Sequence, residues 1–205
     1  MRHVISDEIA DFAAIFNNDI ELVSVSRPET RLAEEMEQQL YRTGYPLTLQ
    51  WRQDAKNVEV PAAKLLHSPV DGSAASLLVE EIVLVNEILH ELLGCKEIGI
   101  RLATLDSPMC PRFHVDAVAC RMLLTVFGPS TEWIANEDVD FSVLADRGSE
   151  LPPVASGRGI RRLLTGGISL LKGGCWQEGF EGVIHRSPNQ SGKRLLISFD
   201  PIFSL

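Results

Sequence analysis

The chain has 205 residues, of which 45% are hydrophobic and 23% charged, a composition typical of a folded domain and not of a disordered chain. Its net charge of −9 at pH 7 argues against binding to nucleic acid or to anionic lipid, because both need a cationic protein surface. A small basic pocket remains compatible with this charge, because a pocket is local and net charge is not.

The sequence predicts a cytoplasmic protein. Asp7, Glu8 and Asp11 stand among the apolar residues at the start of the chain, which is unlike a secretory signal. The most apolar segment, Ala74–Leu93, is interrupted by charged and polar side chains and is not expected to span a bilayer. The four cysteines are too few for a disulfide scaffold and are expected to be reduced: Cys95, Cys110, Cys120 and Cys175.

The first half of the chain is predicted to be mainly helical, from capping residues and apolar positions three and four apart. In chain order the expected elements are a helix over Ser6–Phe16, a strand over Ile20–Val25, a helix from Arg27-Pro28 to Gly44, a strand within Pro46–Lys56, and a helix that begins at Asp71 or Ser73 and ends at Gly94. The breadth of apolar residues on the last helix predicts that it packs against a sheet.

Beyond Lys96 the apolar residues alternate instead, as they do in strands. Five strands are expected, separated by proline and glycine clusters: Glu97–Leu105, Ala119–Phe127, Ile168–Leu171, Gly182–His185 and Arg194–Phe199. Glu137–Arg162 is the least regular stretch and is expected to be a long loop or an insertion over the mouth of a barrel.

Helices followed by many short strands indicate an α+β fold. The N-terminal helices are expected to pack on a C-terminal jelly roll, also called a double-stranded β-helix. We expect residues 1–95 to form the helical extension and residues 96–205 the metal-binding core, together one structural unit.

His114, Asp116 and His185 are predicted to form one metal site. His114 and Asp116 are two residues apart, and on a strand such residues point to the same face. His185 ends a strand-like run and can supply a third ligand. Two histidines and one carboxylate leave open positions on the metal, the arrangement with which non-haem Fe(II) oxygenases bind O2 and a co-substrate.

Enzymes that use 2-oxoglutarate need a cation for its distal carboxylate, and arginine binds a carboxylate with two parallel hydrogen bonds. Arg194 begins the last expected strand, nine residues after His185. It is preferred over Lys193 and over Arg186, which on a regular strand points away from the face of His185. With this order of residues, Glu97–Ile202 resembles the double-stranded β-helix dioxygenases that depend on Fe(II) and 2-oxoglutarate.

A second resemblance covers most of the chain. Four segments together are similar to the bacterial family called domain of unknown function 1826: Cys110-Pro-Arg-Phe-His-Val-Asp116, Gly128-Pro-Ser-Thr-Glu-Trp133, His185-Arg-Ser-Pro188 and Arg194-Leu-Leu-Ile-Ser-Phe-Asp200. Ser130 stands where the family usually has glycine, a departure that concerns only a turn. The resemblance implies a metal-linked role, because members are described near zinc-homeostasis genes, and so implies metal-homeostasis proteins as partners. It leaves the reaction open.

Further residues have candidate roles around this site. Cys110 and Cys120 flank the His-x-Asp pair, and with His114 they are alternative ligands that would select Zn(II). Glu132 is a candidate to orient a ligand histidine, with Trp133 beside it at the rim of the pocket. Arg112 and Arg186 are candidates for contact with substrate. Arg121, five residues past Asp116, is expected to face away from the metal.

The favoured hypothesis is a dioxygenase that uses Fe(II) and 2-oxoglutarate and hydroxylates a substrate that the sequence does not identify. One alternative is a non-catalytic Zn(II)-binding protein for metal storage, sensing or delivery. Another is an interaction module that keeps the jelly roll and binds no metal. The three differ in the metal held and in the need for Arg194.

Overall fold

The structure is a computed structural model that describes residues 2–27, 31–44, 46–146, 148–155, 159–189 and 192–203. Its helices and strands follow the chain in this order: β1 (Arg2–Ser6), the 3-10 helix η1 (Ile9–Phe16), β2 (Ile20–Val25), α1 (Arg31–Thr43), β3 (Thr48–Asp54), α2 (Val60–Leu65), α3 (Gly72–Leu93), β4 (Glu97–Leu105), β5 (Cys120–Phe127), β6 (Glu132–Ile134), η2 (Asn136–Asp138), α4 (Phe141–Ala145), β7 (Arg161–Arg162), β8 (Ile168–Lys172), β9 (Ile184–Arg186) and β10 (Arg194–Ile202).

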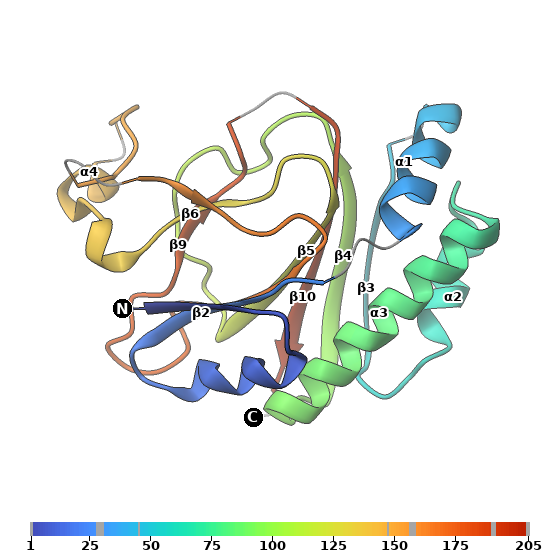
Figure 1. The fold of residues 1–205 in the computed structure, drawn as a ribbon, viewed down its shortest axis with the longest axis horizontal. Coiled ribbons are helices and arrows are strands. Elements are labelled where there is room, and N and C mark those ends of the chain that lie inside the picture. Colours follow the sequence, from blue (N-terminus) through green and yellow to red (C-terminus); the bar gives the residue numbers. More distant parts are fainter. Residues whose placement is uncertain are drawn as a thin grey trace.

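The strands form two sheets. The large sheet has the order β1-β2-β8-β5-β10-β4-β3, in which only the β1–β2 pair is parallel, and the small sheet has the order β7-β6-β9. Helices α1 and α3 lie along one side of the large sheet, while α4 lies beyond the small sheet (Figure 1). The expected combination of helices with a large sheet is confirmed.

Three apolar clusters define the layers. The main cluster joins η1, α1 and α3 to the outer face of the large sheet. A second joins the inner faces of the two sheets, with Leu123 and Leu196 from the large sheet and Trp133 from the small one. A third covers the far face of the small sheet, where Val139 and Val154 pack near Ile134 and Ile184.

Strand β10 shows how the sequence separates these layers. Leu195, Ile197 and Phe199 belong to the main cluster under the helices. The alternate residues face the space between the sheets, where Arg194, Leu196, Ser198 and Asp200 line one cavity. Because successive side chains of a strand point to opposite faces, one nine-residue strand contributes both to the core and to the candidate site.

Several expected elements are confirmed. The strands predicted at Ile20–Val25 and Glu97–Leu105 have these bounds, and the long helix ends at Gly94, whose φ of 66° lies in the left-handed region that favours glycine. The candidate strand within Pro46–Lys56 is β3. The helix expected from Arg27-Pro28 is described from Arg31, and its predicted start at Pro28 lies outside the described residues.

Other expectations need correction. The helix expected over Ser6–Phe16 is instead strand β1 followed by a 3-10 helix. The first 95 residues are not only helical, because β1 and β2 form one edge of the large sheet and β3 forms the other. The described part of Glu137–Arg162 is not one long loop. It contains α4 and β7, and its Val139 and Val154 pack on the far face of the small sheet.

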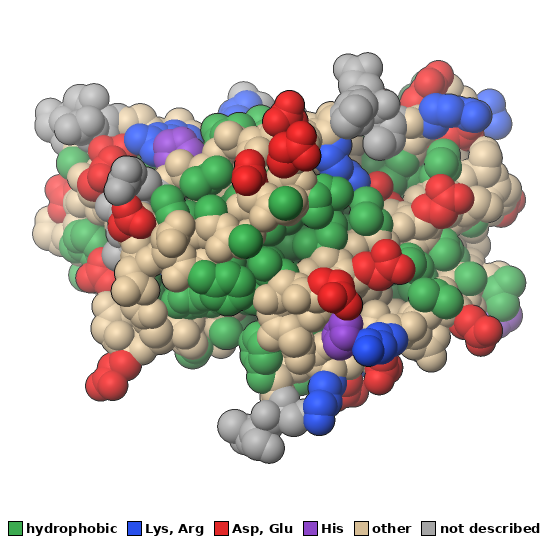
Figure 2. Space-filling model, turned by 60° about the horizontal axis from the view of Figure 1, so that its bottom comes forward, with side chains coloured by type: hydrophobic (Ala, Val, Ile, Leu, Met, Phe, Trp, Pro, Cys, Tyr) green, Lys and Arg blue, Asp and Glu red, His purple; other side chains and the backbone are tan. Residues whose placement is uncertain are grey.

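The surface is not uniformly acidic. Figure 2 turns the bottom of Figure 1 forward and shows hydrophobic side chains gathered near the middle of this face, with acidic side chains spread among them. On η1, Ile9 and Phe16 are exposed, whereas Phe12 and Ile15 are buried. No helix in the described part of the chain combines the length and hydropathy needed to cross a membrane.

Glu21 is the one fully buried carboxylate of β2. It is the extra residue of a bulge, because Arg2 pairs with Ile20 and His3 pairs with Leu22. Its exposed fraction is 0%. Burial raises the pKa of Glu21 to about 7, and the backbone amide of Asn136 opposes this rise only in part.

We expect Glu21→Gln to remove a pH-dependent loss of stability. The folded-state pKa of Glu21 exceeds its ordinary value of 4.5, so between these two pH values the folded chain binds more protons than the unfolded chain. The free energy of unfolding therefore falls as pH rises from about 4.5 to about 7, by on the order of 3 kcal/mol for this group. Urea unfolding of both proteins across this window measures the difference, and parallel curves would contradict the expectation.

Candidate metal centre

Two backbone hydrogen bonds place His114 opposite His185. The amide of each residue donates to the carbonyl of the other, both at 3.0 Å, in an isolated antiparallel bridge. His185 belongs to β9, whereas His114 lies in the connection between β4 and β5. Side chains of such a pair lie on the same face, and the two imidazole centroids are 4.7 Å apart.

Asp116 completes the group. Its Oδ1 lies 3.6 Å from Nε2 of His114, and its Oδ2 lies 3.3 Å from Nε2 of His185. One ligand atom from each of the three residues lies within 4.8 Å of the other two. The structure therefore brings together the three predicted residues, although Asp116 lies outside the regular strands on which the prediction placed it.

Both histidines present the same nitrogen to Asp116. Nδ1 of His114 contacts the carbonyl of Arg112 at 2.9 Å, and Nδ1 of His185 contacts the carbonyl of Val183 at 3.0 Å. Because a carbonyl oxygen can only accept, Nδ1 carries the hydrogen in each ring. Nε2 of each ring is then the atom that faces Asp116, where it donates to the carboxylate when the ring is protonated and can bind a metal when the ring is neutral.

Arg121 holds the carboxylate of Asp116 from the side. Its Nη1 donates to Oδ2 of Asp116 at 2.7 Å, while Nε and Nη2 donate to the two oxygens of Asp200 at 2.6 and 2.8 Å. The expectation that Arg121 faces away was wrong. It counted a regular strand from Asp116, but β5 begins only at Cys120.

The electrostatics of this group keep Asp116 ionised. Burial alone would raise the pKa of Asp116. Hydrogen bonds to His114 and His185, with the charges of His185 and Arg121, outweigh burial and hold that pKa well below its usual range. The pKa of His114 is raised, chiefly by its hydrogen bond with Asp116. A metal cation that took the place of the proton on Nε2 of the histidines would therefore contact an Asp116 carboxylate that is already negatively charged.

Arg194 lies in the same cavity as the triad. It is 3% exposed, and its Nη2 donates to Oγ of Ser187 at 3.1 Å. Its Nη1 is buried and has no hydrogen-bond partner among the described residues. The cavity has a volume of about 290 Å³ and is lined by both the triad and Arg194. A buried N–H without a hydrogen-bond partner lowers the stability of the folded chain. Nη1 of Arg194 is therefore available to donate to an acceptor bound in the cavity.

Close packing fixes the start of β10. Gly128 has a φ of 81°, and a Cβ at this position would lie 2.3 Å from the carbonyl oxygen of Lys193. The turn that the sequence marks by Gly128-Pro129 therefore sits directly against the backbone of Arg194. Lys193, the other candidate cation, lines a different hollow with Thr104 and Asp106.

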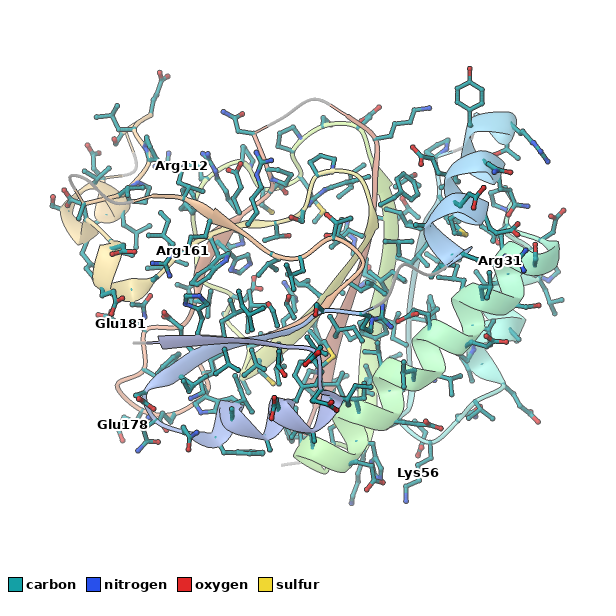
Figure 3. The ribbon with its side chains drawn as sticks, in the orientation of Figure 1. Arg31, Lys56, Arg112, Arg161, Glu178 and Glu181 are labelled. Carbon is teal, nitrogen blue, oxygen red and sulfur yellow. The ribbon has the colours of Figure 1, made fainter. Side chains whose placement is uncertain are left out.

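The other residues of the small sheet have roles that differ from those expected. Glu132 accepts hydrogen bonds from Arg162 and Arg186 and has no described bond to a ligand histidine. Trp133 is not at the rim, because it is buried between the sheets and pairs with His185 along the backbone. Arg161, labelled in Figure 3, lies over the ring of Trp133 at 5.2 Å and donates to Asp138.

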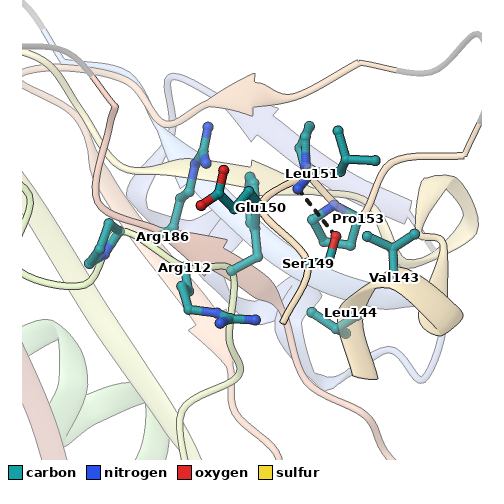
Figure 4. A pocket seen from close by; sticks show the side chains of 11 residues that line it. Arg112, Val143, Leu144, Ser149, Glu150, Leu151, Pro153 and Arg186 are labelled. Carbon is teal, nitrogen blue, oxygen red and sulfur yellow. Dashed lines mark hydrogen bonds between the residues drawn. The ribbon is translucent and has the colours of Figure 1, made fainter. Parts of the chain in front are cut away.

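Arg112 and Arg186 line a second hollow of about 180 Å³ beside the metal group. Figure 4 shows both side chains around Glu150, with Leu151 and Pro153 on the far wall. Arg186 also lies 4.4 Å from the ring centre of Phe113. The expectation that Arg186 mainly faces away from His185 agrees with its bond to Glu132, although it also touches the edge of the larger cavity.

The cysteines do not join the triad. Among the described residues, the group of close metal-binding side chains contains no cysteine. Cys110 is exposed and lines the cavity, whereas Cys120 is buried in the main core cluster. Burial raises the pKa of Cys120 to about 12, which disfavours the thiolate that zinc requires. The alternative zinc site with both cysteines is therefore not assembled by the described residues.

The comparison with family models identifies the chain. A family described as "Protein of unknown function (DUF1826)" matches residues 6–200. The chain belongs to this family. The resemblance inferred from the four sequence segments is thus confirmed, and no protein of curated function matches the DUF1826 chain in sequence.

Solved structures show the fold that this DUF1826 chain shares. The dioxygenase for auxin oxidation 1 from Arabidopsis thaliana, in its 2-oxoglutarate complex, has a TM-score of 0.63 at 10% identity, with 100% of this chain and 93% of that chain covered. The rice dioxygenase for auxin oxidation has a TM-score of 0.54 at 13% identity, with 98% and 83% covered. JOX2, in complex with 2OG, Fe and JA, has a TM-score of 0.51 at 10% identity, with 98% and 75% covered.

We expect Arg121→Met to weaken metal binding about 10- to 100-fold, the usual effect of losing a group that orients a ligand. The variant removes the donor to Asp116 and leaves Asp200 without its two bonds from Arg121. Competition with a coloured chelator measures the affinity. The control is Arg162→Met, which leaves Glu132 still bound by Arg186. Equal metal affinities in the two variants, with folding confirmed by circular dichroism, would show that Arg121 does not support the site.

Proposed function

We propose that the chain is an oxygenase that depends on Fe(II) and 2-oxoglutarate. His114, Asp116 and His185 would hold the metal, and Arg194 would bind the carboxylate of 2-oxoglutarate that lies away from it. The observation that carries this proposal is the buried, unpartnered Nη1 of Arg194 in the same cavity as the triad.

The residues present fit these two groups. Two neutral imidazoles and one carboxylate are the donor set of non-haem Fe(II) oxygenases and leave open coordination positions. Arg194 is fixed by Ser187 through Nη2, so its other edge is available for a carboxylate without a change of rotamer. The shared fold supports the assignment, because two of the similar structures are complexes with 2-oxoglutarate and one of these also contains iron.

When bound, the metal and 2-oxoglutarate would supply oxygen activation and oxidative decarboxylation to succinate. The chain's own residues position these groups. Arg121 keeps the carboxylate of Asp116 in place, and backbone carbonyls keep both imidazoles in the required tautomer. Leu123 and Leu196, both nearly buried, line the cavity between the sheets and limit access of water.

The zinc hypothesis remains a prediction. It named Cys110 and Cys120 as ligands with His114, and because the described residues do not bring these cysteines together with the triad, it would need the same three ligands as the oxygenase. A Zn(II)-binding protein of metal homeostasis does not need Arg194, whereas the oxygenase does. The metal-free interaction module needs neither. Metal analysis and the response to loss of Arg194 therefore separate the three hypotheses.

We expect the purified chain to bind one equivalent of Fe(II) without air, and the added 2-oxoglutarate to produce a weak charge-transfer band in visible light. His185→Ala should lose the metal. Arg194→Met should keep the metal but bind 2-oxoglutarate about 10- to 100-fold more weakly, the effect of losing a charge-assisted hydrogen bond. Arg52→Met is the control, because Arg52, on β3, forms an ion pair with Glu97 of the neighbouring strand β4 and is not among the lining residues of the cavity.

Two results would reject the oxygenase. One is the absence of both the visible band and succinate formation in air with the unmodified chain. The other is tight binding of zinc together with unchanged ligand binding in Arg194→Met, which would favour the zinc hypothesis.

A further inference from the structure

The cavity is more basic than the chain around it. Its lining contains four arginines and two aspartates: Arg101, Arg121, Arg186, Arg194, Asp116 and Asp200. The whole chain, in contrast, has a net charge of −9. A bound divalent metal would make the cavity more positive still. Such a site attracts anions, because charges inside a cleft act in a lower effective dielectric than water.

Three of these arginines already have a role. Arg121 binds both aspartates. Arg186 binds Glu132, which lies outside the lining. Arg194 is assigned to 2-oxoglutarate in the proposed function. Arg101 is the remaining cation, and no hydrogen bond or ion pair joins it to any of the residues that the structure describes.

Arg101 lies on the inner face of the large sheet. On β4 it pairs with Ser198 of β10 on one side and with Gln50 of β3 on the other. All three side chains line the cavity, and Arg101 is partly buried. A hydroxyl and an amide thus stand on either side of a guanidinium, a group of donors suited to the oxygens of one carboxylate.

Arg101 and Arg194 lie at different positions along the inner face of the large sheet. Arg194 of β10 pairs with Leu105, whereas Arg101 of β4 pairs with Ser198 of β10. The two paired positions are thus four residues apart on β10, about 13 Å along the strand. Two apolar side chains line the same face: Leu196, which lies between these two positions on β10, and Leu123 of β5, which is opposite Ser198. The cavity thus has two cationic positions along these strands, with the apolar side chain of Leu196 between them.

We propose that Arg101 binds the carboxylate of the substrate, and that the substrate is a small carboxylic acid with an apolar body. This inference rests on the proposed function, which assigns Arg194 to the co-substrate. The volume of about 290 Å³ is at the lower end for small-molecule sites. Arg101, Ser198 and Gln50 would hold the acid group, while Leu123 and Leu196 would contact the apolar body.

The test compares acids with their neutral amides. The probes are phenylacetate, cinnamate and octanoate, each beside its amide, measured by ligand-detected NMR with the full chain at low salt and without added metal. We expect at least one acid to bind at least tenfold more tightly than its amide. Arg101→Met should abolish this preference, Arg101→Lys should keep part of it, and Arg52→Met should leave it unchanged.

Two outcomes would overturn the inference. The first is that no acid is preferred over its amide by the unmodified chain. The second is that the preference survives in Arg101→Met or Arg101→Gln, with the fold checked by circular dichroism, whatever the result for Arg194→Met.

The same variants separate this inference from the proposed function. Arg101→Met should still show the visible band with Fe(II) and 2-oxoglutarate, because Arg194 and the triad are untouched. If no protein shows that band but acid binding still depends on Arg101, the oxygenase assignment fails while the acid site remains. If the band is present and acid binding does not depend on Arg101, only the substrate inference fails.

Discussion

The candidate site depends on the two hydrogen bonds that the backbones of His114 and His185 exchange. They join the three-residue strand β9 of the small sheet to the connection that leads into β5 of the large sheet. Because the two residues are directly opposite each other in an antiparallel pair, their imidazoles lie side by side even though neither residue belongs to a long strand. Asp116 and Arg121 follow within a few residues, as the chain enters β5. The side chain of Asp116 therefore reaches His185, and that of Arg121 reaches Asp116.

Long periodic elements could be predicted from the sequence, because their apolar residues repeat with one period over many positions. The helix that ends at Gly94 and the strand Glu97–Leu105 are examples. Two short strands, β6 and β7, could not. They have three and two residues, too few for a period; β6 pairs with β9, and β7 pairs with β6. Their position is set by tertiary contacts.

The site was predictable to the extent that residue spacing alone determines geometry. His114, Asp116, His185 and Arg194 share one cavity, as expected. Arg121 was assigned to the wrong side because the count assumed one unbroken strand, whereas β5 begins at Cys120. Glu132 was assigned to a histidine because sequence does not show that two arginines lie nearer. Backbone irregularity and competing partners are both properties of the folded chain.

The candidate ligand residues also have a consequence for the lifetime of the protein. His114 and His185 are about 70 residues apart in the sequence, with four of the strands between them. Their pairing exists only after both sheets have formed, so a metal that binds the triad binds the native chain and not the unfolded one. By mass action its supply would shift the equilibrium toward the folded chain. Resistance to proteolysis, and hence the cellular abundance of the protein, would then follow the availability of the metal.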